Sequence, residues 1–128
     1  MVGARPILLD GTNFTNSFGE TYTITQFKYY ISNIRLITNA SSASEIESYH
    51  LIDQSLPASL SFEFTAEENT FLGLQFLLGV DSLRNVSGAQ TGALDPLNGM
   101  FWTWNSGYVM AKMEGVSPQS NQAGNTIA

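Results

Sequence analysis

The side chains with the clearest chemical potential are one imidazole and two neighbouring indoles. His50 is the only histidine of the 128 residues and lies between Tyr49 and Leu51. Trp102 and Trp104 are two positions apart, so an extended backbone would place both rings on one face. Imidazole is a good copper ligand, whereas an unmodified indole is not. His50 is therefore either a hydrogen-bonded residue of a strand or one ligand of a metal site, and the tryptophans are either packing residues or part of that site.

A second set of side chains is rich in oxygen. Asp81, Asn85 and Asp95 fall within 15 residues of one another, in a stretch that contains several glycines. Calcium takes six to eight oxygen ligands from carboxylates, amides and backbone carbonyls. Asp and Asn also close turns through their own backbone, which is the simpler explanation of the same residues. The sequence leaves both open, an oxygen-ligand loop or a series of Asx turns.

Few residues could support catalysis. Ser48, His50 and Asp53 are close in sequence, but neighbours in a strand point to opposite faces and do not form a triad by proximity. Cysteine is absent, which excludes thiol nucleophiles, thiolate metal sites and disulfides. Glu67 and Glu68 are predicted to lie in a solvated turn. We therefore expect no enzymatic activity.

These residues must be positioned by strands, because apolar and polar residues alternate along most of the chain. Strands are predicted at residues 21–25, 27–37, 49–53, 60–64, 72–78 and 108–114, with a bulge near Ser32 and Asn33. Short strands separated by turn residues predict an all-β fold, an antiparallel β-sandwich formed by one domain over residues 1–128. The most regular alternation predicts the core residues, namely Tyr22, Ile24, Phe27, Tyr29, Ile31, Leu74, Phe76 and Leu78.

Between the last two strands, residues 79–105 form a long segment rich in glycine and tryptophan. Its glycines, Pro96 and turn-forming residues prevent a regular strand or helix. Long structureless loops are uncommon in compact domains, and many of them are functional. We predict an ordered loop, held by Trp102 or Trp104 packed on the sheet and by Asx turns at Asp81 and Asp95.

The chain also resembles a known family. The resemblance rests on GVDSLRNVSGAQTGALDP (residues 79–96), GMFWTWNSGYVMAKMEG (99–115), FKYYISNIRLI (27–37) and SYHLID (48–53), in that order. These motifs are similar to those of the MbnP-like proteins, which are β-rich, secreted or periplasmic bacterial domains related to methanobactin-associated, kynurenine-type copper-binding proteins. Relative to that pattern the chain has no export signal and ends early, so we expect a C-terminally truncated domain whose residues 116–128 are a mobile tail.

The resemblance implies a function that the residues alone do not. In copper proteins of this kind a tryptophan is oxidised to kynurenine, which binds copper together with histidine imidazoles. By resemblance, the metal ligands here would be His50 with an oxidised Trp102 or Trp104, and a di-haem peroxidase would be the partner that oxidises the indole. The copper site is expected in a longer parent protein, because this chain offers no second histidine. A structural or surface-exposed β domain without a metal role is the alternative.

Composition limits the partners further. Eleven acidic residues against five basic ones give a net charge of −6, which argues against nucleic acid as a partner. No apolar run approaches the ~18 residues of a membrane-spanning helix. The incomplete sandwich is expected to leave strand edges unpaired, through which copies of the chain could associate.

Overall fold

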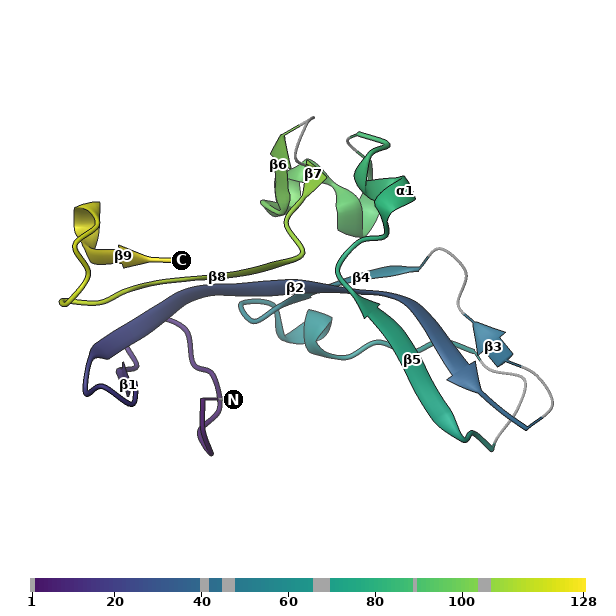
Figure 1. Cartoon of the computed structure of the whole chain (residues 1–128), viewed down its shortest axis with the longest axis horizontal. Coiled ribbons are helices and arrows are strands. Elements are labelled where there is room, and N and C mark those ends of the chain that lie inside the picture. Colours follow the sequence, from purple (N-terminus) through teal and green to yellow (C-terminus); the bar gives the residue numbers. More distant parts are fainter. Residues whose placement is uncertain (1, 40–41, 45–47, 66–69, 89, 104–106) are drawn as a thin grey trace.

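A computed structural model describes residues 2–39, 42–44, 48–65, 70–88, 90–103 and 107–128. One strand, β2 (Thr21–Ile37), runs along most of the molecule and pairs with most of the others (Figure 1). Residues predicted as two strands thus form a single strand of 17 residues, consistent with its β-branched and aromatic content. The fold is all-β and antiparallel, as predicted.

The registers place each partner on one of the two edges of β2. One edge carries β8 (Ala111–Val116) opposite residues 23–29 and β5 (Gly73–Leu78) opposite residues 31–37. The other edge carries the remaining three partners, β1 (Phe14–Thr15), β4 (Tyr49–Asp53) and β3 (Ser42–Ser44). The pairing with β5 shifts register between Ser32 and Arg35, where Asn33 has a φ of 52°, so the predicted bulge is confirmed.

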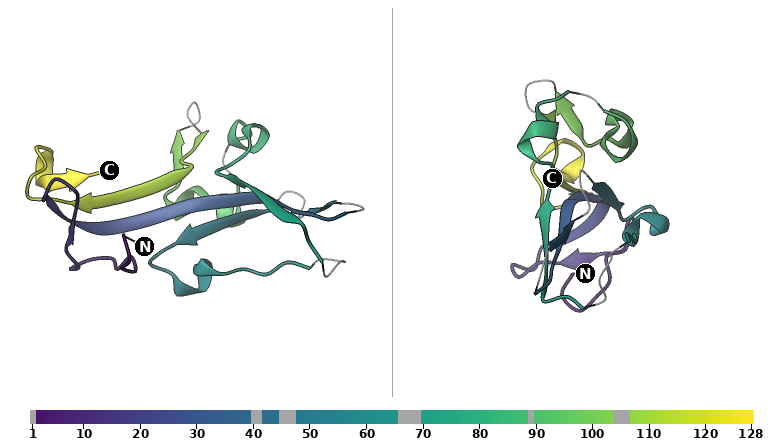
Figure 2. Two further views of the ribbon diagram at one scale, coloured as in Figure 1. Left: turned by 60° about the horizontal axis from the view of Figure 1, so that its bottom comes forward. Right: turned by 90° about the vertical axis from the view of Figure 1, so that its right-hand side faces the viewer.

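The described parts of the long loop, residues 79–88 and 90–103, are structured and rise from the edge where β5 and β8 meet. We call residues 79–110 the dome. Its described parts contain one short α-helix, two 3-10 turns and a small two-stranded sheet, which are α1 (Ser82–Asn85), η2 (Gly92–Leu94), η3 (Pro96–Asn98), β6 (Phe101–Thr103) and β7 (Gly107–Tyr108). Figure 1 and the left view of Figure 2 show the dome projecting from the middle of β2, with the 3-10 turn η1 (Pro57–Leu60) on the other side of that strand.

The two ends of the dome meet at one residue of β2. The amide of Gly79 donates to the carbonyl of Tyr30 at 2.9 Å, and the amide of Tyr30 donates to the carbonyl of Met110 at 3.2 Å. Gly79 has a φ of 119°, and a Cβ there would lie 2.7 Å from the Met110 sulfur. Glycine is therefore required where the chain leaves β5.

The buried cluster differs from the predicted core. It lies between β2 and the dome and consists of Tyr30, Val80, Leu94, Met100 and Tyr108. Of the predicted core residues Ile24 is buried, whereas the β5 residues Leu74, Phe76 and Leu78 are 59%, 48% and 60% exposed. The prediction for β5 was wrong because alternation identifies an apolar strand without showing whether another layer covers it.

Two further segments differ from their predictions. Residues 60–64 were predicted as a strand, but Pro57 begins η1 and residues 61–65 form no strand. Proline favours the first turn of a helix, which displaces the start of any strand. The C-terminal segment was expected to be a poorly packed tail, yet β9 (Thr126–Ile127) pairs with β8 after the 3-10 turn η4 (Ala123–Asn125), and the Ser117 hydroxyl donates to the Thr21 carbonyl at 2.7 Å.

Candidate functional site

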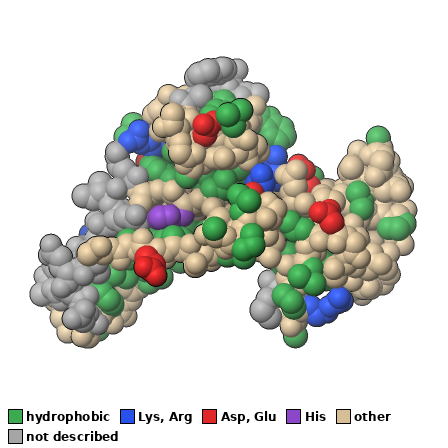
Figure 3. All heavy atoms as spheres, turned by 180° about the vertical axis from the view of Figure 1, so that it is seen from behind, with side chains coloured by type: hydrophobic (Ala, Val, Ile, Leu, Met, Phe, Trp, Pro, Cys, Tyr) green, Lys and Arg blue, Asp and Glu red, His purple; other side chains and the backbone are tan. Residues whose placement is uncertain are grey.

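A groove runs along β4 where the dome reaches across β2. Its polar part, of about 250 Å³, is lined by Tyr49, Arg84, Gln90, Thr91, Ala93 and Leu94. Its apolar part, of about 430 Å³, shares Tyr49 and Ala93 and continues past His50, Leu51 and Phe62 to η1. Figure 3 shows the His50 ring at the surface, between the dome and the body of the molecule. We call the two parts together the β4 groove.

His50 lines the apolar part and is held against an aromatic ring. Its position in β4 is opposite Ile31 of β2, which fixes the backbone. Its ring stacks on Phe62 with centroids 3.7 Å apart and an interplanar angle of 6°. Phe62 lies in the segment 60–64 that was predicted as a strand but does not form one. Its contact with His50 could therefore not be predicted from the strand pattern. The stack leaves His50 half-buried at a groove that a small ligand could enter.

The carboxylate of Asp53, three residues after His50, has partners of its own. Asp53 accepts hydrogen bonds from the amide and the hydroxyl of Ser55, at 2.9 and 2.7 Å, and its other oxygen lies 3.5 Å from the Lys28 ammonium. Burial is the largest influence on the pKa of Asp53 and opposes ionisation, but the Ser55 hydrogen bonds and Lys28 outweigh it and lower the pKa. The carboxylate of Asp53 is therefore a structural acceptor that fixes the end of β4.

The polar part of the groove joins β4 to the dome. The Tyr49 hydroxyl donates to the Asp81 carboxylate. Burial is the largest cause that raises the pKa of Tyr49, to about 12, and the hydrogen bond to Asp81 is the second. The Arg84 guanidinium donates to the Gln90 side-chain oxygen at 3.2 Å, and the Gln90 amide group donates back to the Arg84 carbonyl at 3.0 Å. The Arg84–Gln90 pair was not predicted, because no local sequence pattern shows that these two side chains meet.

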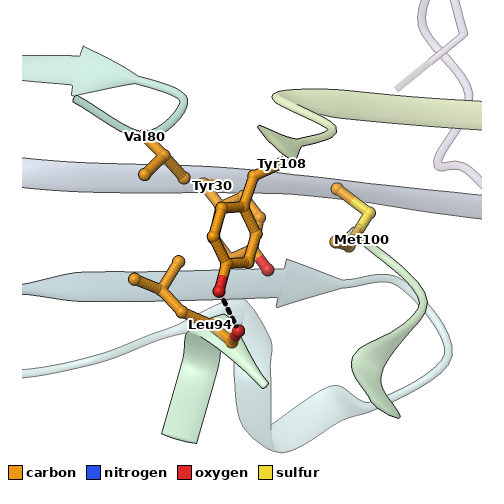
Figure 4. Packing of buried hydrophobic residues seen from close by; sticks show 5 residues of the cluster. All are labelled: Tyr30, Val80, Leu94, Met100 and Tyr108. Carbon is orange, nitrogen blue, oxygen red and sulfur yellow. Dashed lines mark hydrogen bonds between the residues drawn. The ribbon is translucent and has the colours of Figure 1, made fainter. Parts of the chain in front are cut away.

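The floor of the dome is the buried cluster, which Figure 4 shows from close by. The rings of Tyr30 and Tyr108 meet edge to face at 6.2 Å. The Tyr108 hydroxyl donates to the backbone carbonyl of Leu94 at 2.5 Å and accepts from the backbone amide of Gln90 at 3.2 Å. The Tyr30 hydroxyl donates to the Ala93 carbonyl at 2.9 Å. Burial raises the pKa of both tyrosines, so both hydroxyls stay protonated and act as donors.

The tryptophans do not match their predicted packing role where the structure describes them. Trp102 is 69% exposed, whereas Phe101 packs on Tyr108 with ring centroids 5.0 Å apart. Because neighbouring strand residues face opposite ways, the inward position of Phe101 turns Trp102 outward. Of the two tryptophans predicted to hold the loop, Trp102 is therefore not the packed one, and among the described residues the tyrosines of the buried cluster hold it. Trp104 lies outside the described residues.

The predicted oxygen-ligand residues each have a different protein partner. Asp81 accepts from Tyr49, the side-chain oxygen of Asn85 accepts from the Tyr108 amide at 2.7 Å, and Asp95 accepts from the Leu97 amide at 2.9 Å. The Asx interaction predicted at Asp95 is therefore present, whereas Asp81 begins α1 without capping it. These contacts are structural, and they connect β4, α1 and β7.

The donor set does not by itself form a copper site. Copper sites require several nitrogen or sulfur donors that converge on the ion. Within the part of the chain that the structure describes, no three His, Cys, Asp or Glu residues are grouped so that they could hold a metal ion. His50 supplies one imidazole, and Trp102 as an unmodified indole supplies no ligand.

Comparisons with known proteins identify the family. No helix in the described part of the chain is long and apolar enough to cross a membrane. Searches of curated proteins and of solved structures give no match. The model of one family, MbnP, matches residues 1–127, which is nearly the whole chain and includes the groove, the dome and both tryptophans. The chain belongs to the MbnP family.

Proposed function

We propose that the protein is a non-catalytic, copper-associated binding protein that acts in the periplasm or outside the cell. The observation that carries this proposal is the family match over residues 1–127, because the family is associated with methanobactin and copper. The β4 groove adds a location, since the only imidazole of the chain lines it.

The metal would require donors beyond the described, unmodified residues. We propose that Trp102 or Trp104 is oxidised to kynurenine, with a peroxide as the oxidant: two peroxide equivalents deliver two oxygen atoms as the indole C2–C3 bond is cleaved and are reduced to water, and hydrolysis then releases C2 as formate. The resulting amine and carbonyl supply the ligands that an indole lacks. The exposure of Trp102 supports this, because a ring that is 69% exposed is accessible to a second protein such as a di-haem peroxidase. His50 would contribute an imidazole nitrogen. Its stacking on Phe62 fixes the plane of the ring and so limits the directions from which an ion can approach.

A structural or surface-exposed β domain without a metal role is the second candidate. It is favoured by the lack of any group of three His, Cys, Asp or Glu residues among those described. The two candidates differ in the state of the tryptophans and in metal content, and both can be measured on protein from its natural source.

The test is native purification followed by mass spectrometry and metal analysis. Trypsin would release residues 85–112 as one peptide, because no Lys or Arg lies between Arg84 and Lys112, and this peptide carries both tryptophans. The proposal predicts a kynurenine at one of them and copper that is lost in a His50→Gln variant. Protein from the periplasmic or secreted fraction with two intact tryptophans and no copper would establish the second candidate instead.

A further inference from the structure

The most apolar strand of the chain is also its most exposed one. β5 and the two residues before it present six large apolar side chains on both faces of the strand. They are Phe71, Leu72, Leu74, Phe76, Leu77 and Leu78, with exposed fractions between 39% and 66%. Their exposed fractions together equal about three fully exposed side chains, or on the order of 500 Å² of apolar surface. Monomeric proteins rarely leave contiguous apolar patches larger than a few hundred Å².

No described element pairs with the outer edge of β5, which is therefore open toward the described part of the chain. Among the described elements β5 is hydrogen-bonded only to β2. Its backbone is regular, since the bulge at this pairing lies on β2 near Asn33. The Gly79 amide points toward β2, where it donates to the Tyr30 carbonyl. At the other end of the strand the Leu72 amide also donates to β2, to the Ile37 carbonyl at 2.7 Å. Between these two contacts, alternate amides of β5 point to the open edge.

The sequence of β5 lacks the devices that normally protect an open edge. Edge strands of monomeric proteins usually carry lysine, proline or an inward-pointing charge. Residues 70–80 contain no charged residue and no proline, although the chain as a whole has a net charge of −6. This favours a second copy as the occupant, because two acidic molecules can approach through uncharged strands while their carboxylates stay outside the contact.

We propose that β5 pairs antiparallel with β5 of a second copy, so that one continuous sheet runs through a symmetric dimer. A two-fold axis at Phe76 would place Leu74 opposite Leu78 of the second copy and would pair the outward amides of both strands. The pairing would cover the flanks of Leu74, Phe76 and Leu78 that face the second copy, so part of the exposed apolar surface of β5 would be buried together with its backbone edge.

The first test is the oligomeric state measured by analytical ultracentrifugation over a range of concentrations. We expect a discrete dimer for the wild-type chain. The double variant Leu74→Lys, Leu78→Lys adds charge at two exposed positions of the edge and should raise the dimer dissociation constant at least about tenfold. The matched control is Leu83→Lys, Leu97→Lys, which adds the same charge at exposed leucines of the dome and should leave the dimer unchanged. Circular dichroism confirms that both variants fold.

The second test exploits the absence of cysteine. A Phe76→Cys variant should form an intermolecular disulfide under mild oxidation, because residues at the axis of an antiparallel pair lie within disulfide distance. A Leu83→Cys control should stay monomeric on a denaturing gel. A monomeric wild-type chain, a dimer that both lysine variants retain, or aggregates without a discrete size would each overturn the proposal.

Discussion

Replacing Tyr108 with phenylalanine removes one oxygen from the floor of the dome and keeps its ring. That oxygen donates to the Leu94 carbonyl and accepts from the Gln90 amide, whereas the contacts of the ring with Tyr30 and Phe101 need no hydroxyl. Each lost hydrogen bond costs about 0.5–1.5 kcal/mol, and each buried group left without a partner costs roughly 1–3 kcal/mol. Both partner residues line the polar part of the β4 groove, where water can replace the hydroxyl. We therefore expect a loss of about 2 kcal/mol in the free energy of unfolding.

Urea denaturation measures this loss directly. The midpoint should fall while the slope stays constant, since the surface exposed on unfolding is unchanged. The matched control is Tyr29→Phe on the same central strand. Its half-buried hydroxyl makes no hydrogen bond to the described residues, so its stability should stay within about 0.5 kcal/mol of the wild type.

Hydrogen exchange would show where the stability is lost. If the cluster holds the dome, amides in residues 80–110 should exchange faster in the Tyr108→Phe variant than those of β2 and β8. A Tyr108→Phe variant that unfolds like the wild type, with unchanged exchange in the dome, would refute the claim that the Tyr108 hydroxyl holds the dome on β2.

Three further substitutions test the exposure of Trp102, the burial of Met100 and the structural role of Asp53. Trp102→Ala should alter the free energy of unfolding by no more than about 0.5 kcal/mol in a chemical melt, because the side chain is largely exposed; a loss of several kcal/mol would show that it packs after all. Met100→Ala should cost about 2–5 kcal/mol in the same melt, because it empties space in a fully buried cluster, and a near-neutral result would contradict that burial. Asp53→Asn should destabilise the protein at neutral pH by weakening the contacts with Ser55 and Lys28. Because the folded pKa of Asp53 is lowered, its contribution is present above the unfolded pKa of about 4 and is lost as the pH falls through the folded pKa. Melts across this range should therefore bring wild type and variant together at low pH, and a constant difference would contradict the assignment.

The strands and the bulge could be predicted because they depend on local pattern. Alternation was sufficient to place β4 and, as two segments, β2, and the bulge near Asn33 followed from the interrupted alternation. The same pattern also predicted a strand at residues 60–64, where Pro57 begins η1 instead. The exposure of Leu74, Phe76 and Leu78 could not be predicted, since apolar alternation is the same for a covered and an uncovered strand.

The candidate site was found only in part, for a similar reason. His50 was identified by its residue type, but its stacking partner Phe62 and the Arg84–Gln90 pair come from segments distant in sequence. Trp102 or Trp104 was predicted to pack because large aromatics are usually buried, but Phe101 faces inward in β6, so the next residue, Trp102, faces outward. Side-chain direction in a strand of three residues depends on its neighbours in space more than on its own pattern.

Calorimetric titration with divalent copper shows whether oxidation of a tryptophan to kynurenine creates the metal site. The unmodified chain, produced in a host without the oxidising partner, should bind copper no more tightly than an ordinary protein with a single surface histidine, because it holds one histidine and no cysteine and its described residues form no group of three His, Cys, Asp or Glu. The form in which Trp102 or Trp104 has been oxidised to kynurenine should bind far more tightly, and His50→Gln should weaken that binding. Tight stoichiometric binding by the unmodified chain, or equally weak binding by the oxidised form, would contradict the account.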